Sequence, residues 1–393
     1  MCTTKWYKQL QLEFNVFSVK NFTKVIFMMD YLYTNITDNG SYKCIFFHFG
    51  TNKTINPQLL TRIGGKDISD PHKHTLCLQC DIPNEAIHQN ATTIDFMLIS
   101  DNDLINGVVI TICRFYNSSF NFLNSRIYLE NTTRQLELIN KSRNRNSTLI
   151  ASCTQTSHHD LYFPLWINYH YKMGIDHFYI YDHAPSNLTR LHHSLKSYID
   201  LNIITIIPWY INQWNGFKYR SSPSEWIAHQ IWSQNDCIHR YGYLYSWILI
   251  SDVDELVVPT GNLTNFKQML DIVPSNYCAL QVLSYNFKSL HNNITVSEED
   301  RPKRFIHRDQ KSKNRNSHSK NFVRPELIYY FSVHEVTKSV NESPVFYADV
   351  QTHGRIQHYR GDFIPTEQLA NFTIDTHILS FINQINNSLS SIS

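Results

Sequence analysis

The feature that most constrains the fold of this 393-residue chain is an alternation of strand-like and helix-like segments between residues 148 and 250. Four short apolar runs, TLIASC, HFYIYD, IITIIPW and LYSWILI, are separated by longer stretches at 160–173, 186–201 and 222–241 whose apolar residues recur at helical spacing. Because strands joined by helices pair in parallel, this order predicts an α/β fold with a doubly wound, mainly parallel sheet.

The first half of the chain has a different pattern. From Cys44 to about Tyr128, short extended runs such as KCIFFHF, TIDFMLI and VVITICRF alternate with turn signals and show no helical period. The polar, basic stretch NKSRNRNST has no apolar periodicity and marks a natural boundary. The sequence therefore predicts a β-rich, sandwich-like N-terminal domain over 1–145 and the α/β domain over 146–393.

Two similar acidic motifs, LISDND and LISDVDE, occupy different places in this pattern. The first lies between two extended runs, which favours a hairpin loop in which Asp101 and Asp103 bond the local backbone. The second follows the fourth strand of the α/β region. Ligands of open α/β sheets bind outside the carboxyl ends of the strands, so Asp252 and Asp254 are the candidate site residues.

The spacing of this second pair suits a metal ion. Carboxylates at positions i and i+2 of an extended chain point to the same side, so Asp252 and Asp254 are expected to share one Mn²⁺ or Mg²⁺ ion. Such an ion bridges the diphosphate of a nucleotide-linked donor and neutralises the leaving group. A solvated turn at the strand end is the plain structural alternative, because Asp-x-Asp is a short motif.

Other classes of function lack their motifs. The first strand is followed by TQTSHHD, without the glycines that cradle a dinucleotide or P-loop phosphate, and the chain has no G-x-S-x-G nucleophile motif. His334 and Glu335 lack the second histidine of a zinc peptidase helix. With a net charge of +2 and one short basic run at 311–320, no nucleic-acid partner is expected.

The composition points to the secretory pathway. The chain contains fifteen Asn-x-Ser/Thr sequons, whereas its Asn, Ser and Thr content would produce about six by chance. Its eight cysteines lack the spacing of a four-thiolate zinc site, so disulfides are expected, with Cys44, Cys77, Cys80 and Cys113 as candidates. No run of eighteen apolar residues occurs, and membrane attachment is not visible in this chain.

Several segments between about 160 and 365 resemble, in order, glycosyltransferase family 92, whose members are galactosyltransferase-type enzymes with a GT-A fold. The matching pieces are WINYHYKMGIDHFYIYDHAPSN, IITIIPW, QIWSQNDCIHRYGYLYSWILISDVDELVVP, YNFKSLH, KNFVRPELI with the following VHEV, and IQHYRGDF. The resemblance implies inverting transfer of a sugar, expected to be galactose, from a UDP-sugar to a glycan or glycoprotein acceptor. It also implies a location in the Golgi lumen.

The resemblance assigns roles to individual residues. The metal and diphosphate motif is Asp252 and Asp254, followed by Glu255, with a further ligand from His334 or His358. The candidates for nucleotide binding are Asp182, Asn235 and Asp236. Those for acceptor or phosphate binding are His291, Lys320 and Arg324. The catalytic base is sought among Glu298, Glu299 and Asp300, with Asp362 in reserve.

Plainer alternatives stand beside these roles. Asp182 can be a helix-entry residue, Asn235 and Asp236 can cap or pack, and the two cations can be solvated surface groups. The chain also departs from the family pattern at Leu165, Lys288 and Leu290, where an acidic residue and glycines are expected. The alternatives for the whole chain are a catalytically decayed carbohydrate-binding protein and a GT-A transferase of another family with a different donor.

Overall fold

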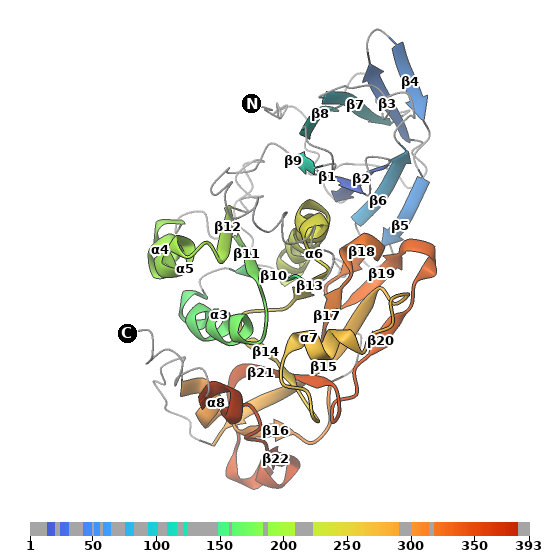
Figure 1. Ribbon diagram of the computed structural model, residues 1–393. Coiled ribbons are helices and arrows are strands. Elements are labelled where there is room, and N and C mark those ends of the chain that lie inside the picture. The colour runs from blue at the N-terminus through green and yellow to red at the C-terminus, as the bar shows by residue number, and fades with distance from the viewer. Residues whose placement is uncertain are drawn as a thin grey trace. The chain divides into compact units, whose positions relative to one another are not determined.

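The computed structural model (Figure 1) divides into two compact units, which we describe separately. It describes strand backbone within residues 14–123 and, beyond these, the ranges 148–156, 159–183, 188–208, 223–290, 300–313 and 318–383. The N-terminal unit contains Met1–Leu138, Tyr210–Leu244 and Ile328–Val333. The sheet unit contains Ile139–Trp209, Tyr245–Leu327 and His334–Ser393. The domain boundary at residue 145 stays a prediction.

The described part of the first 138 residues is entirely strand. One antiparallel sheet has the order β1-β2-β6-β5 and the other β4-β3-β7-β8-β9. The bounds are β1 (Phe14–Val19), β2 (Lys24–Asp30), β3 (Tyr42–His48), β4 (Thr51–Ile55), β5 (Gln58–Ile63), β6 (Thr75–Asp81), β7 (Thr93–Ser100), β8 (Val108–Phe115) and β9 (Asn121–Leu123). Strands β7 and β8 pair as the predicted hairpin, and their loop with Asp101 and Asp103 lies outside the described residues. The sandwich-like arrangement stays a prediction.

The N-terminal unit also contains helix α6 (Pro223–Tyr241), the short helix η5 (Gly242–Leu244) and strand β18 (Ile328–Ser332). Helix α6 falls in the predicted range 222–241 and begins at Pro223, which lacks an N–H and suits a first helical position. Its inward residues Ile231 and Ile238 are buried, as their helical spacing predicts.

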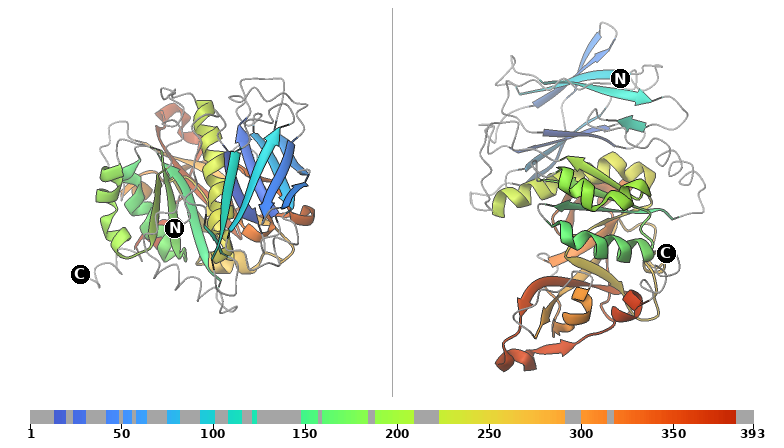
Figure 2. Two further views of the ribbon diagram at one scale, coloured as in Figure 1. Left: turned by 90° about the horizontal axis from the view of Figure 1, so that it is seen from above. Right: turned by 90° about the vertical axis from the view of Figure 1, so that its left-hand side faces the viewer.

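The sheet unit confirms a mixed α/β fold with a large sheet in the C-terminal region. The four predicted strands are β10 (Ile150–Thr156), β11 (His177–Asp182), β12 (Ile204–Pro208) and β13 (Trp247–Ile250). All their pairings are parallel, in the order β12-β11-β10-β13, and Figure 2 shows the green strands β10, β11 and β12 side by side. The first strand in sequence therefore lies inside the sheet.

Beyond β13 the sheet becomes mixed. Strand β17 (Ser319–Val323) is antiparallel to both β13 and β15 (Ala279–Ser289). The remaining strands of this sheet are β14 (Glu255–Pro259), β16 (His307–Asp309), β20 (Val345–Tyr347), β21 (Gly354–Phe363) and β22 (Phe372–Ile374). The direction changes at β17, so the strands that follow the fourth predicted strand do not continue the parallel pattern.

Four helices of the sheet unit fall in the predicted ranges 160–173 and 186–201: η2 (Asp160–Tyr162), α3 (Phe163–Lys172), α4 (Leu188–Ser194) and α5 (Lys196–Asp200). Helices α7 (Phe266–Asp271) and α8 (Arg301–Arg304) lie outside those ranges. Helix α3 is followed by Gly174 at φ +112°, a left-handed conformation that favours glycine, which confirms the predicted stop. The single helix expected over 186–201 is instead two helices that break at the buried Leu195.

Helix α3 packs on the core of the sheet unit. Trp166 is fully buried, and its ring lies 5.1 Å from that of Phe178 on β11, centroid to centroid. Phe163 and Ile167, on the same helical face, are also fully buried.

Within the described ranges, no helix has the length and apolar character needed to cross a membrane.

A second face of α3 binds strand β14. The hydroxyl of Tyr169 donates to the carbonyl of Val257 over 3.0 Å, and the Val257 N–H donates to Nε2 of His170 over 3.3 Å. Nδ1 of His170 lies 2.9 Å from the carbonyl of Trp166 and therefore carries the proton. Burial lowers the pKa of His170 to about 3, so the ring is neutral and uses both nitrogens.

We expect His170 to make stability fall as the pH falls below 6.5. The unfolded state takes up a proton there and the folded state does not, so lowering the pH from 7 to 5 costs about 2 kcal/mol of the free energy of unfolding. Denaturant unfolding at both pH values checks this. His170→Gln should reduce the loss by about that amount, whereas His193→Gln, at an exposed position, should not; equal losses in all three proteins contradict the assignment.

Candidate functional site

The carboxyl edge of the parallel strands gathers the predicted acidic residues. Thr156 at the end of β10 pairs with Asp182 at the end of β11, and on the other side of β10 Cys153 pairs with Ile250, the last residue of β13. Asp252 follows two residues later. Asp182 and Asp252 thus follow the strands that flank β10 on the same edge, where ligands of open α/β sheets bind.

The acidic motif is a turn, so the expectation of extended backbone from residue 252 to 254 is wrong. The N–H of Glu255 donates to the carbonyl of Asp252 over 3.2 Å, and the N–H of Asp252 donates to the Glu255 carboxylate over 3.2 Å. These two bonds close the turn because the chain must leave β13 and enter β14 within four residues. Val253 is buried, while the Asp252 and Asp254 side chains are 36% and 32% exposed.

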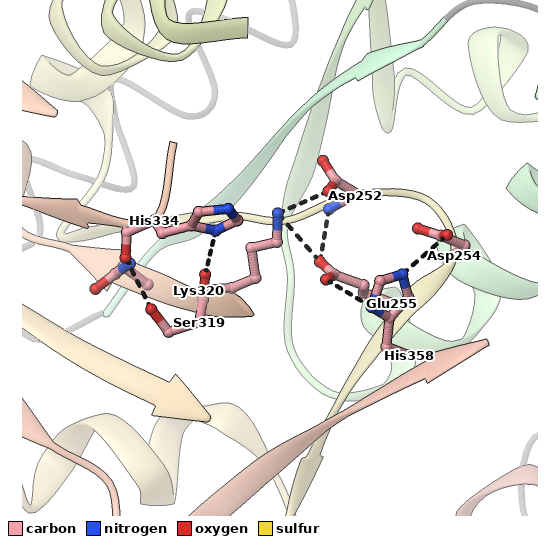
Figure 3. A network of polar contacts seen from close by, with 8 residues as sticks. Asp252, Asp254, Glu255, Ser319, Lys320, His334 and His358 are labelled. Atoms are coloured by element: carbon pink, nitrogen blue, oxygen red, sulfur yellow. Dashed lines mark hydrogen bonds and ion pairs between the residues drawn. The ribbon is translucent and has the colours of Figure 1, made fainter. Parts of the chain in front are cut away.

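Lys320 lies beside this turn. Its strand β17 runs antiparallel to β13, so the first residues of β17 lie next to the carboxyl end of β13. The Lys320 ammonium is 2.7 Å from Oδ2 of Asp252 and 3.4 Å from Oε2 of Glu255 (Figure 3). The side chain is only 1% exposed, so the structure contradicts the reading of Lys320 as a solvated surface group.

His358 lies on the other side of the turn, on strand β21. This strand pairs with β14 so that His358 is directly opposite Glu255. Nε2 of His358 is 3.2 Å from Oδ2 of Asp254, and Nδ1 is 3.7 Å from Oε1 of Glu255. The next residue, Tyr359, donates its N–H to the carbonyl of Asp254 over 3.0 Å. Strand β21 therefore holds both the backbone and the carboxylate of Asp254.

Burial and charge act differently on these groups. Burial raises the pKa of Glu255 to about 7, although the Lys320 charge opposes it. Burial acts in the same direction on Asp254, but the hydrogen bond with His358 and the charges of His358 and Lys320 lower its pKa below the usual value. Burial opposes the charge of Lys320, yet the carboxylates of Asp252 and Glu255 raise the Lys320 pKa above its usual value. Asp254 and Lys320 therefore remain charged near pH 7, whereas the carboxyl of Glu255 titrates close to that pH.

His334 and Asp252 lie on opposite sides of the Lys320 ammonium (Figure 3). Nδ1 of His334 is 3.1 Å from the carbonyl of Ser319, and since a carbonyl only accepts, Nδ1 carries the proton. Burial, followed by the charge of Lys320, lowers the pKa of His334 to about 4. The ring is therefore neutral near pH 7 and has its lone pair on Nε2, the form in which histidine binds metals.

The donor atoms suit a hard divalent cation. Among the described residues, no group of three or more His, Cys, Asp or Glu side chains is assembled to hold a metal ion. The turn nevertheless presents two partly exposed carboxylates, which are the ligands that Mn²⁺ and Mg²⁺ prefer, and a neutral imidazole lies nearby. The carboxylates of Asp252 and Asp254 therefore suit the predicted ion by ligand type, while the described residues assemble no third ligand beside them.

Most candidates for the catalytic base cannot be placed. Glu298, Glu299 and the side chain of Asp362 lie outside the described residues, as does the predicted acceptor residue His291. Asp300 is described, and its carboxylate pairs with Lys303 at 2.7 Å on an exposed face. The following residue, Arg301, donates to the carbonyl of Tyr359 over 2.9 Å. Helix α8, which Asp300 precedes, is thus tied to the residue after His358.

The structure does not bring Arg324 to this edge. Arg324 follows β17 at its other end, four residues and roughly 13 Å along the strand from Lys320. Its guanidinium stacks 4.1 Å above the ring of Trp247, the first residue of β13, and donates to the carbonyl of Val273 over 3.1 Å. Arg324 therefore secures the opposite end of the sheet.

Asn235 and Asp236 lie on α6 in the N-terminal unit and are fully buried there. The amide nitrogen of Asn235 donates to the carbonyls of Ile231 and Phe331, over 2.8 and 2.7 Å, and its oxygen accepts the Phe331 N–H over 2.9 Å. Both polar atoms of the Asn235 amide therefore bond within this unit and hold α6 to β18. This is the packing role that was one of the alternatives from the sequence.

Two of the three residues at which the chain departs from the family pattern take part in packing. Leu165 packs at the margin of the core of the sheet unit, and the Lys288 ammonium lies 5.5 Å from the ring centroid of Phe372, whereas Leu290 is 38% exposed. The sequence gives no clear signal for two features of Glu255, its burial and its contact with Lys320. Lys320 is 65 residues further along the chain, and short-range periodicity does not predict such distant partners.

Comparisons with known proteins give one match that carries an argument. The family model "Glycosyltransferase family 92" matches residues 150–392, which include every described residue of the site. A search of curated sequences finds no significant match. Among solved structures, the flavohem-like FAD/NAD-binding domain of nitric oxide dioxygenase from Vibrio cholerae O1 biovar El Tor has 10% identity and a TM-score of 0.13, over 55% of this chain and 75% of that one. That likeness carries no argument. The match over most of the chain shows that this protein belongs to glycosyltransferase family 92.

Proposed function

We propose that this transferase is metal-dependent and moves a sugar from a UDP-sugar donor to a glycan acceptor, with UDP-galactose as the first donor to test and with inversion at the anomeric carbon. The observation that carries the proposal is the acidic turn, with two accessible carboxylates at the carboxyl edge of the parallel strands. Family membership supports the reaction class. The turn supports the use of a Mn²⁺ or Mg²⁺ ion and a diphosphate donor.

Each group has a distinct task in this proposal. Asp252 and Asp254 hold the ion, which, when bound, neutralises the charge that develops on the departing UDP. We assign binding of the donor nucleoside to Asp182, which ends β11 on the far side of β10 from β13. We assign the uptake of the proton from the acceptor hydroxyl to a carboxylate among Glu298, Glu299 and Asp300. Of these, Asp300 lies within the described residues and precedes α8, whose Arg301 bonds the carbonyl of Tyr359.

The two candidate histidines are not equivalent. His358 already uses Nε2 on Asp254, and binding a metal through that nitrogen would release the carboxylate it orients. His334 has Nδ1 on a carbonyl and its lone pair on Nε2. We therefore assign the additional metal ligand to His334 and the orientation of Asp254 to His358.

The proposed location is the lumen of the secretory pathway, with the Golgi as the expected compartment. In the described part of the sheet unit, the sequon residues Asn262, Asn341 and Asn371 are all exposed, as glycosylation requires. Cys153 and Cys237 each take part in a disulfide, which suits an oxidising compartment. Cys278, by contrast, is a free thiol buried in the sheet unit.

Asp252→Asn and Asp254→Asn should each reduce Mn²⁺-dependent release of UDP from UDP-galactose by at least about a hundredfold, because each removes a ligand that carries negative charge. Donor hydrolysis is the measurement, since it needs no knowledge of the acceptor. Asp101→Asn, in the matching LISDND motif, is the control and should retain wild-type activity.

Equal loss at Asp101 and Asp252, or no loss at Asp252, contradicts the assignment. If no UDP-sugar is hydrolysed, calorimetry with UDP and Mn²⁺ decides between the remaining functions. Metal-dependent UDP binding favours another donor or a strict need for acceptor. Glycan binding without metal-dependent UDP binding favours the carbohydrate-binding alternative. The departures from the family pattern at Leu165, Lys288 and Leu290 are the reason for testing that alternative.

The assignment of the histidines predicts a difference between two conservative variants. His334→Gln should weaken Mn²⁺ binding by about ten- to a hundredfold, because an amide is a poor substitute for an imidazole ligand. His358→Gln should retain most of the affinity, since an amide N–H can still donate to Asp254. Calorimetric titration with Mn²⁺ measures both, and the reverse order of the two affinities would exchange the roles.

A further inference from the structure

The most unusual charged group in the described part of the site is Lys320. Lysine is almost never fully buried unless it is paired, and Lys320 is 1% exposed with two carboxylates beside its ammonium. Of these, Glu255 is itself 2% exposed and cannot rely on water to solvate its charge. Three carboxylates fall within the four residues from Asp252 to Glu255, so the turn needs a positive charge to remain compact.

We propose that Lys320 is a permanent internal counter-ion of the acidic turn: it holds Asp252 and Glu255 in place before any divalent ion arrives, and its charge keeps the affinity for that ion low. This inference rests on the proposed function and assigns a positioning residue to the same site. It replaces the expectation that Lys320 contacts phosphate or acceptor directly.

The backbone around Lys320 favours a fixed position. Strand β17 is hydrogen-bonded on both sides, with Lys320 opposite Val282 of β15 and the next residue, Asn321, opposite Ile250 of β13. The ammonium is 1% exposed, so it would have to leave Asp252 and Glu255 to move towards solvent, and the buried Glu255 carboxylate would then lose its cation. That cost favours a stationary lysine.

The same charge opposes a metal ion. The Lys320 ammonium contacts Oδ2 of Asp252, a carboxylate proposed to bind the ion, so a divalent cation at the turn lies within a few ångströms of a fixed positive charge. Even at the dielectric constant of bulk water, repulsion over such a distance lowers affinity by about tenfold. With Lys320 in place, the acidic turn keeps its shape without the divalent ion and binds that ion more weakly than it would without the lysine. Weaker binding favours reversible exchange of the ion.

Lys320→Met should have two effects of opposite sign. The protein without metal should melt at a temperature several degrees lower, because the carboxylates lose their buried partner. Its affinity for Mn²⁺ should rise by about tenfold, because the ion now supplies the missing charge. Thermal unfolding with and without Mn²⁺, together with calorimetric titration, measures both effects, and neither measurement depends on transferase activity.

Three further proteins serve as controls. Lys320→Arg retains the charge and should keep the Mn²⁺ affinity of the wild type more closely than Lys320→Met does. Lys320→Met combined with Glu255→Gln removes one charge of each sign and should recover thermal stability. Lys196→Met breaks an exposed pair with Asp200 and should change neither quantity. If Lys320→Met alone does not fold, the double variant replaces it in the titration, with a smaller rise in affinity expected.

Unchanged or weaker Mn²⁺ binding by a folded Lys320→Met protein overturns the proposal, because a purely structural lysine would give that result. Failure of Glu255→Gln to restore stability overturns it as well. Failure of the proposed function looks different: the wild type would then bind no Mn²⁺ or hydrolyse no UDP-sugar, while the melting temperatures of the single and double variants still test the counter-ion.

Discussion

The ion pair between Lys320 and Asp252 depends on a change of strand direction. Strands β12, β11, β10 and β13 run parallel and bring their carboxyl ends to one edge, and β17 then enters the sheet antiparallel to β13. This reversal places the beginning of β17 beside the end of β13. A cation from one segment thereby meets an acidic turn from another, and the site can hold three carboxylates within four residues of chain. A β17 parallel to its neighbour would place Lys320 at the opposite edge.

The turn is held from several sides of the sheet unit. Strand β21 bonds Asp254 through the N–H of Tyr359 and the ring of His358, while α3 binds Val257 two residues after Glu255 through Tyr169 and His170. The histidines differ because their surroundings differ. His170 is a neutral structural group with both nitrogens used, His334 has its lone pair on Nε2, and His358 orients a carboxylate. Residue type alone does not distinguish such roles.

Much of the α/β region could be predicted from local pattern. The strand at 177–182, the glycine stop after α3, the proline start of α6 and the position of the acidic motif after the fourth strand follow from periodicity and end signals. The resemblance to glycosyltransferase family 92, carried by the ordered motifs from residue 160 onward, is confirmed by the family match. Local pattern failed where tertiary contacts compete with it: the helix over 186–201 breaks, and residues 252–254 turn instead of extending.

The α/β class, the family resemblance and the candidate metal pair could be predicted because they depend on residue spacing along the chain. The set of distant residues that share the site became visible only in the folded chain. Folding brings Lys320 and His358 to the turn. It places Arg324 at the opposite end of β17, and it uses Asn235 to link α6 to β18. The physical reason is that pairing partner, strand direction and burial are set by contacts between segments tens of residues apart. A periodicity of two or 3.6 residues contains no information about them.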